Sequence, residues 1–180
     1  MTKIRIKNFG PIKEGFTEND GWLDIKKVTV FIGNQGSGKS TVAKLISTLT
    51  WLEKAINKGD IDVSLIYLNT FKSFFNAQNV LNYFNEKTEI EYLGEKIHLI
   101  YEAEKENLSI AVLKNTLTVP KIMYVPSERN FFSVVERANS LNDLPYMVRQ
   151  FGEELKRAHF ALNNELIDLP IGGIKFNYNI

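Results

Sequence analysis

Hydrophobic and polar positions alternate at the start of the chain and then give way to a continuous apolar run. Residues 3–7 alternate basic and apolar side chains, which is the two-residue period of a strand buried on one face. A turn follows at Gly10-Pro11, and residues 21–24 fit a second short strand. Residues 28–32, the apolar run, predict a central strand buried on both faces.

A helical period begins shortly after this run. From Lys39 to Asn57 the apolar residues recur three and four positions apart, and Lys58-Gly59 supplies a stop. A second helix is expected from about residue 61, with Asp60 as its cap, and continues with a break to Phe84. The aromatic side chains of this second segment are most simply interpreted as core, because they recur at helical spacing.

The remainder of the chain mixes predicted strands and helices. Three strands in an antiparallel meander are expected at 89–93, 96–102 and 108–113. A buried strand is predicted over 121–125, between Pro120 and Pro126. Helical pieces follow around 131–138 and 145–164, and a final strand is expected at 174–178.

Between the apolar run and the first helix, residues 33–40 read GNQGSGKS and match the pattern G-x-x-x-x-G-K-[ST]. This pattern binds phosphate where a buried strand leads into a helix N-terminus, and both flanks are predicted here. A tight strand-to-helix turn with no ligand is the alternative. That alternative explains neither Lys39 nor Ser40 at this spacing, so the sequence predicts a nucleotide-binding loop.

Each residue of the loop has an expected chemical role. The predicted nucleotide-binding residues are Gly33, Asn34, Gln35, Gly36, Ser37, Gly38, Lys39, Ser40 and Thr41. Gly33 is expected to let the strand turn, and Gly36 and Gly38 to let backbone N–H groups approach phosphate closely. Lys39 is expected to reach the β- and γ-phosphate oxygens and Ser40 to ligate Mg²⁺. Thr41 is expected to donate to the α-phosphate, while Asn34 and Gln35 form the outer wall.

Composition indicates the general class of protein but does not identify a binding partner. With 180 residues and 44% hydrophobic content, the chain has enough material for one substantial core. The 22 basic and 21 acidic side chains nearly balance, so no global charge favours nucleic acid. There is no cysteine, and neither a signal-like start nor an apolar run of membrane-spanning length. These features predict a cytoplasmic protein with no membrane segment.

The order of these elements resembles the first half of an ABC-type ATPase head, in the SMC, RecF and overcoming-lysogenization-defect branch. The opening strand, the Asn8-Phe9 pair, the turn over 10–13 and GNQGSGKS carry the resemblance. Residues 124–130, YVPSERN, resemble the strand-end motif of bacterial AAA-type ATP-binding proteins in that branch. The resemblance implies an α/β P-loop NTPase fold, an N-terminal lobe with an antiparallel β insert, and ATP and Mg²⁺ as cofactors.

On this interpretation residues 1–180 form a single, partial ATPase domain. Its expected parts are 1–58 with the strands, phosphate loop and helix, 59–118 with a helix and the meander, and 119–180 with a strand, polar loop and helices. Ser127-Glu128 would then occupy the loop where ABC heads carry a glutamine that senses Mg²⁺ and water. Glu128 would ligate the metal or act in catalysis, and Arg129 would sense phosphate. The alternative is that these are surface residues at a strand end.

Two elements that hydrolysis needs in that family are not found in this sequence. These are an apolar strand ending in Asp-Glu and a Ser-Gly signature that completes the partner's site. We therefore expect an ATP-binding lobe whose hydrolysis depends on a C-terminal lobe or on a nucleotide-dependent head-to-tail dimer. The alternatives are a small P-loop kinase and a non-catalytic nucleotide-binding interaction module.

Several other residues are weaker candidates for function. Lys3, Arg5 and Lys7 would share one strand face, and in related heads such a face meets DNA; a charged edge strand is the favoured alternative. His98 and His159 support no metal site, because neither has a nearby ligand in sequence. Three aromatic residues near the loop are possible adenine-stacking side chains, with ordinary packing as the alternative: Phe9, Phe16 and Trp22.

Overall fold

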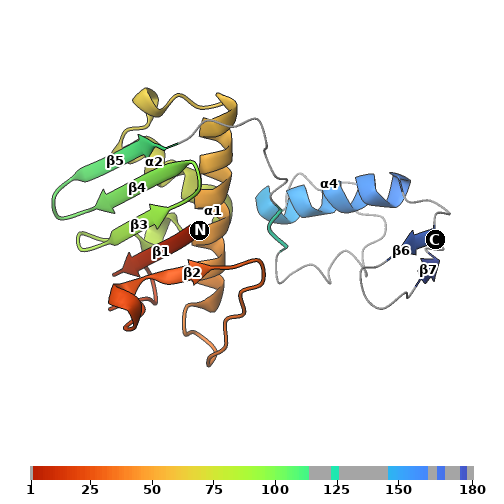
Figure 1. Ribbon diagram of the computed structural model, residues 1–180, viewed down its shortest axis with the longest axis horizontal. Helices are drawn as coiled ribbons and strands as arrows, with labels where there is room; N and C mark the ends of the chain where they lie inside the picture. Colours follow the sequence, from red (N-terminus) through yellow and green to blue (C-terminus); the bar gives the residue numbers. More distant parts are fainter. Residues whose placement is uncertain (1, 114–122, 126–145, 162–165, 169–174, 178–180) are drawn as a thin grey trace. The chain divides into compact units, whose positions relative to one another are not determined.

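One antiparallel sheet organises the first part of the chain (Figure 1). Its strands are β1 (Thr2–Lys7), β2 (Leu23–Ile25), β3 (Glu89–Leu93), β4 (Ile97–Glu102) and β5 (Asn107–Val112). Their spatial order is β2-β1-β3-β4-β5, so the strand that begins the chain lies inside the sheet. Alternation explains the two faces of β1: Ile4 and Ile6 are buried in the core, while Lys3, Arg5 and Lys7 lie on the opposite face.

The computed structural model describes residues 2–113, 123–125, 146–161, 166–168 and 175–177. The chain divides into two compact units, Met1–Met123 and Tyr124–Ile180. The second unit contains the helix α4 (Tyr146–Ala161) and the antiparallel pair β6 (Leu166–Asp168) and β7 (Lys175–Asn177). Secondary structure is therefore mixed α and β, as predicted, and the finer division into three parts stays a prediction.

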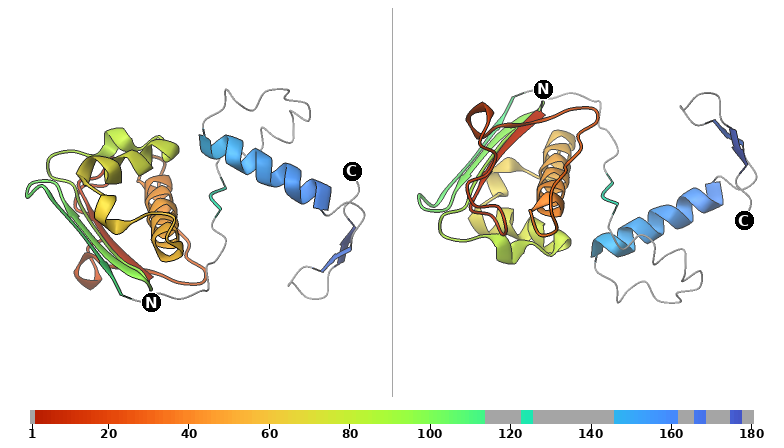
Figure 2. Two further views of the ribbon diagram at one scale, coloured as in Figure 1. Left: turned by 90° about the horizontal axis from the view of Figure 1, so that it is seen from above. Right: turned by 90° about the horizontal axis from the view of Figure 1, so that it is seen from below.

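Helices cover one face of the five-stranded sheet. The long helix is α1 (Lys39–Lys58), and a short helix α2 (Leu68–Ser73) lies on the same side (Figure 2). Short 3₁₀ turns complete the first unit: η1 (Asn19–Gly21), η2 (Val63–Leu65), η3 (Phe74–Gln78) and η4 (Leu81–Tyr83). The helical period predicted over 39–57 is confirmed, and Gly59 ends α1 in the left-handed conformation.

The core lies between α1 and the sheet. Leu45, Leu49 and Leu52 of α1 are fully buried against the inward-facing residues of β1, β3 and β4. Burying each of these leucines contributes about 1.5–3 kcal/mol relative to exposure. Phe71 and Phe75 extend the core with an edge-to-face contact of 5.3 Å between ring centroids. The interpretation of the aromatic residues after position 61 as core is confirmed for these two.

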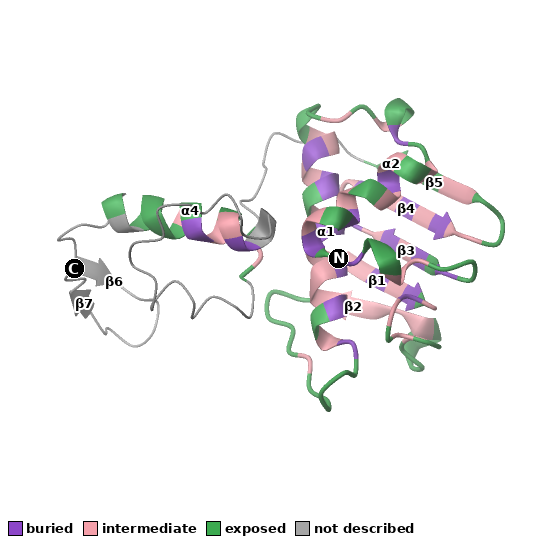
Figure 3. Cartoon of the chain, turned by 180° about the vertical axis from the view of Figure 1, so that it is seen from behind, coloured by how far each residue is buried: buried purple, intermediate pink, exposed green. Residues whose placement is uncertain are grey.

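The predicted central strand over 28–32 is wrong. This segment belongs to no strand, and Val28, Val30 and Ile32 are 77%, 72% and 92% exposed. Figure 3 shows the chain between β2 and α1 as largely exposed. A local cause lies in Thr29, whose hydroxyl accepts from the Lys26 N–H at 3.0 Å and lies 3.4 Å from the Lys26 carbonyl. Such side-chain to backbone bonds compete with strand pairing directly after β2.

The predicted second helix over 61–84 is also wrong as a single element, because it is divided among η2, α2, η3 and η4. Asp60 does not cap it but pairs with Lys58 at 3.0 Å. The capping carboxylate is Asp62, which accepts from the Ser64 N–H at 2.9 Å. Asn79 ends η3 with a φ of 55°, a conformation that no helix continues through.

The later predictions have mixed outcomes. The meander is confirmed as β3, β4 and β5, as are the helix over 145–164 (α4) and the final strand (β7). Strand β6, which pairs with β7, was not predicted, because Leu166–Asp168 lies at the end of a helical pattern in the sequence. Residues 123–125 form no strand, so the described part of the predicted strand over 121–125 is wrong. The predicted helix over 131–138 lies outside the described residues.

No helix in the described part of the chain is long and apolar enough to span a bilayer.

Candidate functional site: a glycine-rich loop at the start of α1

The loop before α1 has the backbone geometry that its glycines permit. Gly36 and Gly38 have φ values of 79° and 90°, which side-chain-bearing residues rarely adopt. The Ser37 N–H donates to the Asn34 carbonyl at 3.3 Å, and the Val42 N–H begins the helical ladder on Gly38 at 2.9 Å. Gly33 does not have a positive φ, and its expected role in turning the chain stays a prediction. The result is a tight loop that leads into a helix of 20 residues.

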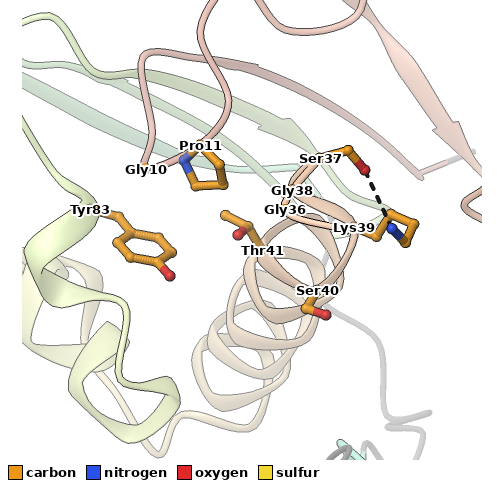
Figure 4. A pocket seen from close by; sticks show the side chains of 9 residues that line it. All are labelled: Gly10, Pro11, Gly36, Ser37, Gly38, Lys39, Ser40, Thr41 and Tyr83. Atoms are coloured by element: carbon orange, nitrogen blue, oxygen red, sulfur yellow. Dashed lines mark hydrogen bonds between the residues drawn. The ribbon is translucent and has the colours of Figure 1, made fainter. Parts of the chain in front are cut away.

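Lys39 closes this loop on itself. Its Nζ donates to the carbonyls of Gly33 at 2.7 Å and Asn34 at 2.5 Å. It also donates to Ser37 Oγ at 3.4 Å, the bond drawn in Figure 4. Among the described residues, the ammonium group is therefore held by three neutral oxygens and by no carboxylate. Charge-assisted bonds to phosphate oxygens are roughly twice as strong as bonds between neutral groups, so an anion in the loop would compete for this ammonium.

A turn after β1 supports the loop from outside. The Asn8 N–H donates to Lys13 O at 2.8 Å, and Phe9 and Ile12 exchange two backbone bonds across the turn. A Cβ on Gly38 would lie 3.0 Å from Ile12 Cγ1, so the glycine allows the loop to pack closely on this turn. The Asn8 carbonyl accepts from Thr88 Oγ1 at 2.6 Å, which fixes the turn to the loop before β3.

A cavity of about 330 Å³ opens between the loop and this turn. It is lined by Gly10, Pro11, Gly36, Ser37, Gly38, Lys39, Ser40, Thr41 and Tyr83 (Figure 4). The predicted residues from Gly36 to Thr41 are thus brought together at one cavity. Gly33 and Asn34 contribute only their carbonyls to Lys39, and Gln35 is exposed outside the lining.

Sequence reasoning missed Tyr83 and did not assign the Gly10-Pro11 turn to the site. Nothing in the local pattern marks Tyr83, because it lies at the end of the segment read as one helix. Of the three aromatic residues considered near the loop, Phe9 is fully buried in the core and Phe16 is 43% exposed outside the lining. Trp22 lies beneath Lys3, with Nζ 4.2 Å from the centroid of the indole ring.

A buried carboxylate holds α1 in place toward its other end. Glu53 is 7% exposed and accepts from Tyr92 Oη at 2.7 Å and from the backbone N–H groups of Lys96 at 2.6 Å and Ile97 at 3.3 Å. Burial, together with the neighbouring Glu53 carboxylate, raises the pKa of Tyr92 far above its usual range. These bonds attach the helix that carries the loop to the β3–β4 hairpin.

The basic residues of β1 have acidic neighbours on the outer face of the sheet. Arg5 pairs with Glu91, and Lys7 approaches Glu89 at 3.7 Å. His98 Nε2 lies 2.9 Å from the same Glu91 carboxylate. The prediction of a charge-protected edge strand is wrong, because β1 has β2 and β3 as neighbours. The basic stripe is instead matched by carboxylates of the adjacent strand, which reduces its attraction for phosphate.

Of the two expected Mg²⁺ ligands, Ser40 and Glu128, only Ser40 lies in the described part of the chain. Ser40 is exposed at the cavity, where its hydroxyl fits an ion that keeps several waters and takes its remaining ligands from phosphates. The described residues contain no group of three or more His, Cys, Asp or Glu that would hold a metal by themselves. Ser127, Glu128 and Arg129 lie outside the described residues, as does the side chain of His159.

Together these features define a mixed α/β protein with a glycine-rich, lysine-containing loop at the start of a long helix. Comparison with known proteins adds no closer identity. No protein-family model matches the chain, and no curated protein or solved structure matches it either.

Proposed function

We propose that this protein binds ATP with Mg²⁺ through residues 33–41, as the N-terminal lobe of an ABC-type, SMC- or RecF-like P-loop ATPase. The observation that carries the proposal is the cavity at the start of α1, where the residues from Gly36 to Thr41 converge. The sequence GNQGSGKS supports it, because every conserved position of the phosphate-loop pattern is filled.

Electrostatics at the cavity favour a polyphosphate. The N-terminus of α1 carries roughly half a positive charge from aligned peptide dipoles. Lys39 adds a full charge, and no acidic side chain is among the nine residues of the lining. The β-phosphate would lie against the backbone N–H groups of the loop, and Lys39 would exchange its carbonyl partners for β- and γ-phosphate oxygens.

The hydroxyls of the lining complete the proposed site. Ser40 would ligate Mg²⁺, which would neutralise phosphate charge when bound. Thr41, which is buried at the first turn of α1, would donate to the α-phosphate. Both residues already belong to the lining of the cavity.

Hydrolysis needs a group that this lining lacks. A base that activates water is normally a carboxylate or a glutamine side chain, and the lining contains neither. We propose that such a group comes from a second lobe or from a partner in a head-to-tail dimer, with Glu128 as the candidate within this chain. The protein alone is then expected to bind ATP and to hydrolyse it negligibly.

Calorimetric titration of ATP and Mg²⁺ into the wild type and Lys39→Ala tests the binding proposal. Loss of Lys39 should weaken binding by at least tenfold, since a charge-assisted bond to phosphate contributes about 1.5–3 kcal/mol. Lys58→Ala is the matched control, because it removes the same charge from the other end of α1, where Lys58 pairs with Asp60 at the surface. Equal affinity in Lys39→Ala and wild type would contradict the proposal, and steady multiple turnover would contradict its hydrolytic part.

A further inference from the structure

The cavity at the start of α1 has two chemically different ends. One end consists of the loop from Gly36 to Thr41, with Lys39 as its cation. The other consists of the aromatic ring of Tyr83 and the ring of Pro11, and Figure 4 shows Tyr83 on the opposite side of the cavity from Lys39. An inorganic anion would use only the first end. A ligand that uses both needs an anionic part and a flat apolar part.

Tyr83 is held firmly at this position. Its carbonyl accepts from the Gly10 N–H at 3.1 Å, and its own N–H donates to Val80 O at 3.1 Å. Its ring makes an edge-to-face contact with Phe9 at 5.7 Å between centroids and 75° between planes. Phe9 is fully buried, so the ring of Tyr83 has a fixed neighbour on its core side.

Gly10 shows how closely the turn approaches this ring. A Cβ added to Gly10 would lie 2.5 Å from Tyr83 Cδ2, and the residue has a φ of 53°. Any side chain at this position would push the ring away and strain the backbone. The glycine therefore lets the Tyr83 ring and the adjacent Pro11 border the same cavity as the phosphate loop.

We infer that Tyr83 is the side chain that contacts the nucleobase, stacking on it at the end of the cavity bordered by Pro11. The inference rests on the proposed nucleotide-binding function and deepens it, because it assigns a base-recognising residue outside the phosphate loop. Stacking on an aromatic ring accepts any base and gains with the area of the base, so purine nucleotides are favoured over pyrimidine nucleotides.

The test compares ATP with inorganic tripolyphosphate, each with Mg²⁺, by calorimetric titration of the full chain. Tyr83→Ala should weaken ATP binding by about tenfold or more and leave tripolyphosphate binding within about twofold, because only ATP has a base to stack. Tyr83→Phe keeps the ring and should retain ATP affinity within about threefold. The preference of the wild type for ATP over UTP should shrink in Tyr83→Ala.

Controls separate stacking from loss of structure. Leu81→Ala changes an exposed residue of the same η4 turn that does not line the cavity, and it should leave both affinities unchanged. Unchanged tripolyphosphate binding by Tyr83→Ala shows that the phosphate loop is still folded. Equal losses for ATP and tripolyphosphate, or no loss for either, would overturn the role of Tyr83 while the proposed function stands. Wild-type protein that binds neither ligand would overturn both.

Discussion

The two ends of helix α1 are fixed in different ways. Toward its C-terminus, Leu49 and Leu52 are fully buried and the Glu53 carboxylate bonds to the β3–β4 hairpin. At its N-terminus, the glycine-rich loop is exposed from Gly33 to Ser37 and is shaped by its glycines, by Lys39 and by the turn at Ile12. One end is fixed by the core and the other by local bonds.

This difference teaches how stability and the proposed ligand binding are divided along one helix. Apolar burial and buried hydrogen bonds contribute free energy of folding mainly at the C-terminal end. The loop contributes little apolar burial, so its residues are available to exchange partners with a ligand. Substitutions at the two ends should therefore affect different measurements, and three substitution experiments examine this contrast.

The largest expected effect is on the free energy of unfolding. Leu49→Ala should lower it by about 2–5 kcal/mol, because the leucine is fully buried and its removal leaves a cavity. Val30→Ala, in the segment that leads to the loop, should change it by less than about 0.5 kcal/mol, because Val30 is 72% exposed. Urea denaturation followed by circular dichroism measures both. A loss for Val30→Ala as large as that for Leu49→Ala would mean that residues 28–32 are buried after all.

Regular elements with one buried face could be predicted from the sequence. In α1 the buried positions Leu45, Leu49 and Leu52 keep the helical period, because one face of the helix meets the sheet throughout. In β4 the buried positions Ile97, Leu99 and Tyr101 alternate for the same reason. Periodicity succeeds where a single packing partner covers the whole element.

The failures have a different physical origin. The run over 28–32 has the composition of a buried strand, but composition carries no information on whether a neighbouring strand is available to bury it. The candidate site likewise contains residues that could be predicted from the sequence and one that could not. The residues from Gly36 to Thr41 were predictable because the loop is continuous in sequence, whereas Tyr83 reaches the cavity from a distant segment through packing on Phe9 and Gly10.

A smaller effect is expected at the buried carboxylate near the C-terminal end of α1. Glu53→Gln should lower the free energy of unfolding by about 1–2 kcal/mol, because hydrogen bonds to a charged acceptor exceed those to a neutral one. Affinity for ATP should stay within about threefold, since the loop is fixed separately. Glu86→Gln, at an exposed position, is the control and should have no measurable effect on either quantity. If ATP affinity fell in proportion to stability, the two ends of α1 would not be independent.

The smallest effect is a pH dependence that comes from Tyr92, the buried hydrogen-bond partner of this carboxylate. Burial and Glu53 raise the pKa of Tyr92 in the folded protein, so the folded state keeps this proton when the unfolded chain begins to ionise near pH 10. The contribution is fully present below that pH and is lost progressively as pH rises above it toward the higher pKa of the folded state, with a loss of roughly 1 kcal/mol between pH 9 and pH 10.5. Tyr92→Phe should remove this part of the alkaline loss, and Tyr67→Phe, at a residue 68% exposed, should keep it. Urea denaturation at a series of pH values would measure the slopes; identical slopes for wild type and Tyr92→Phe would show that Tyr92 ionises alike in both states, and that the bond to Glu53 does not hold its proton.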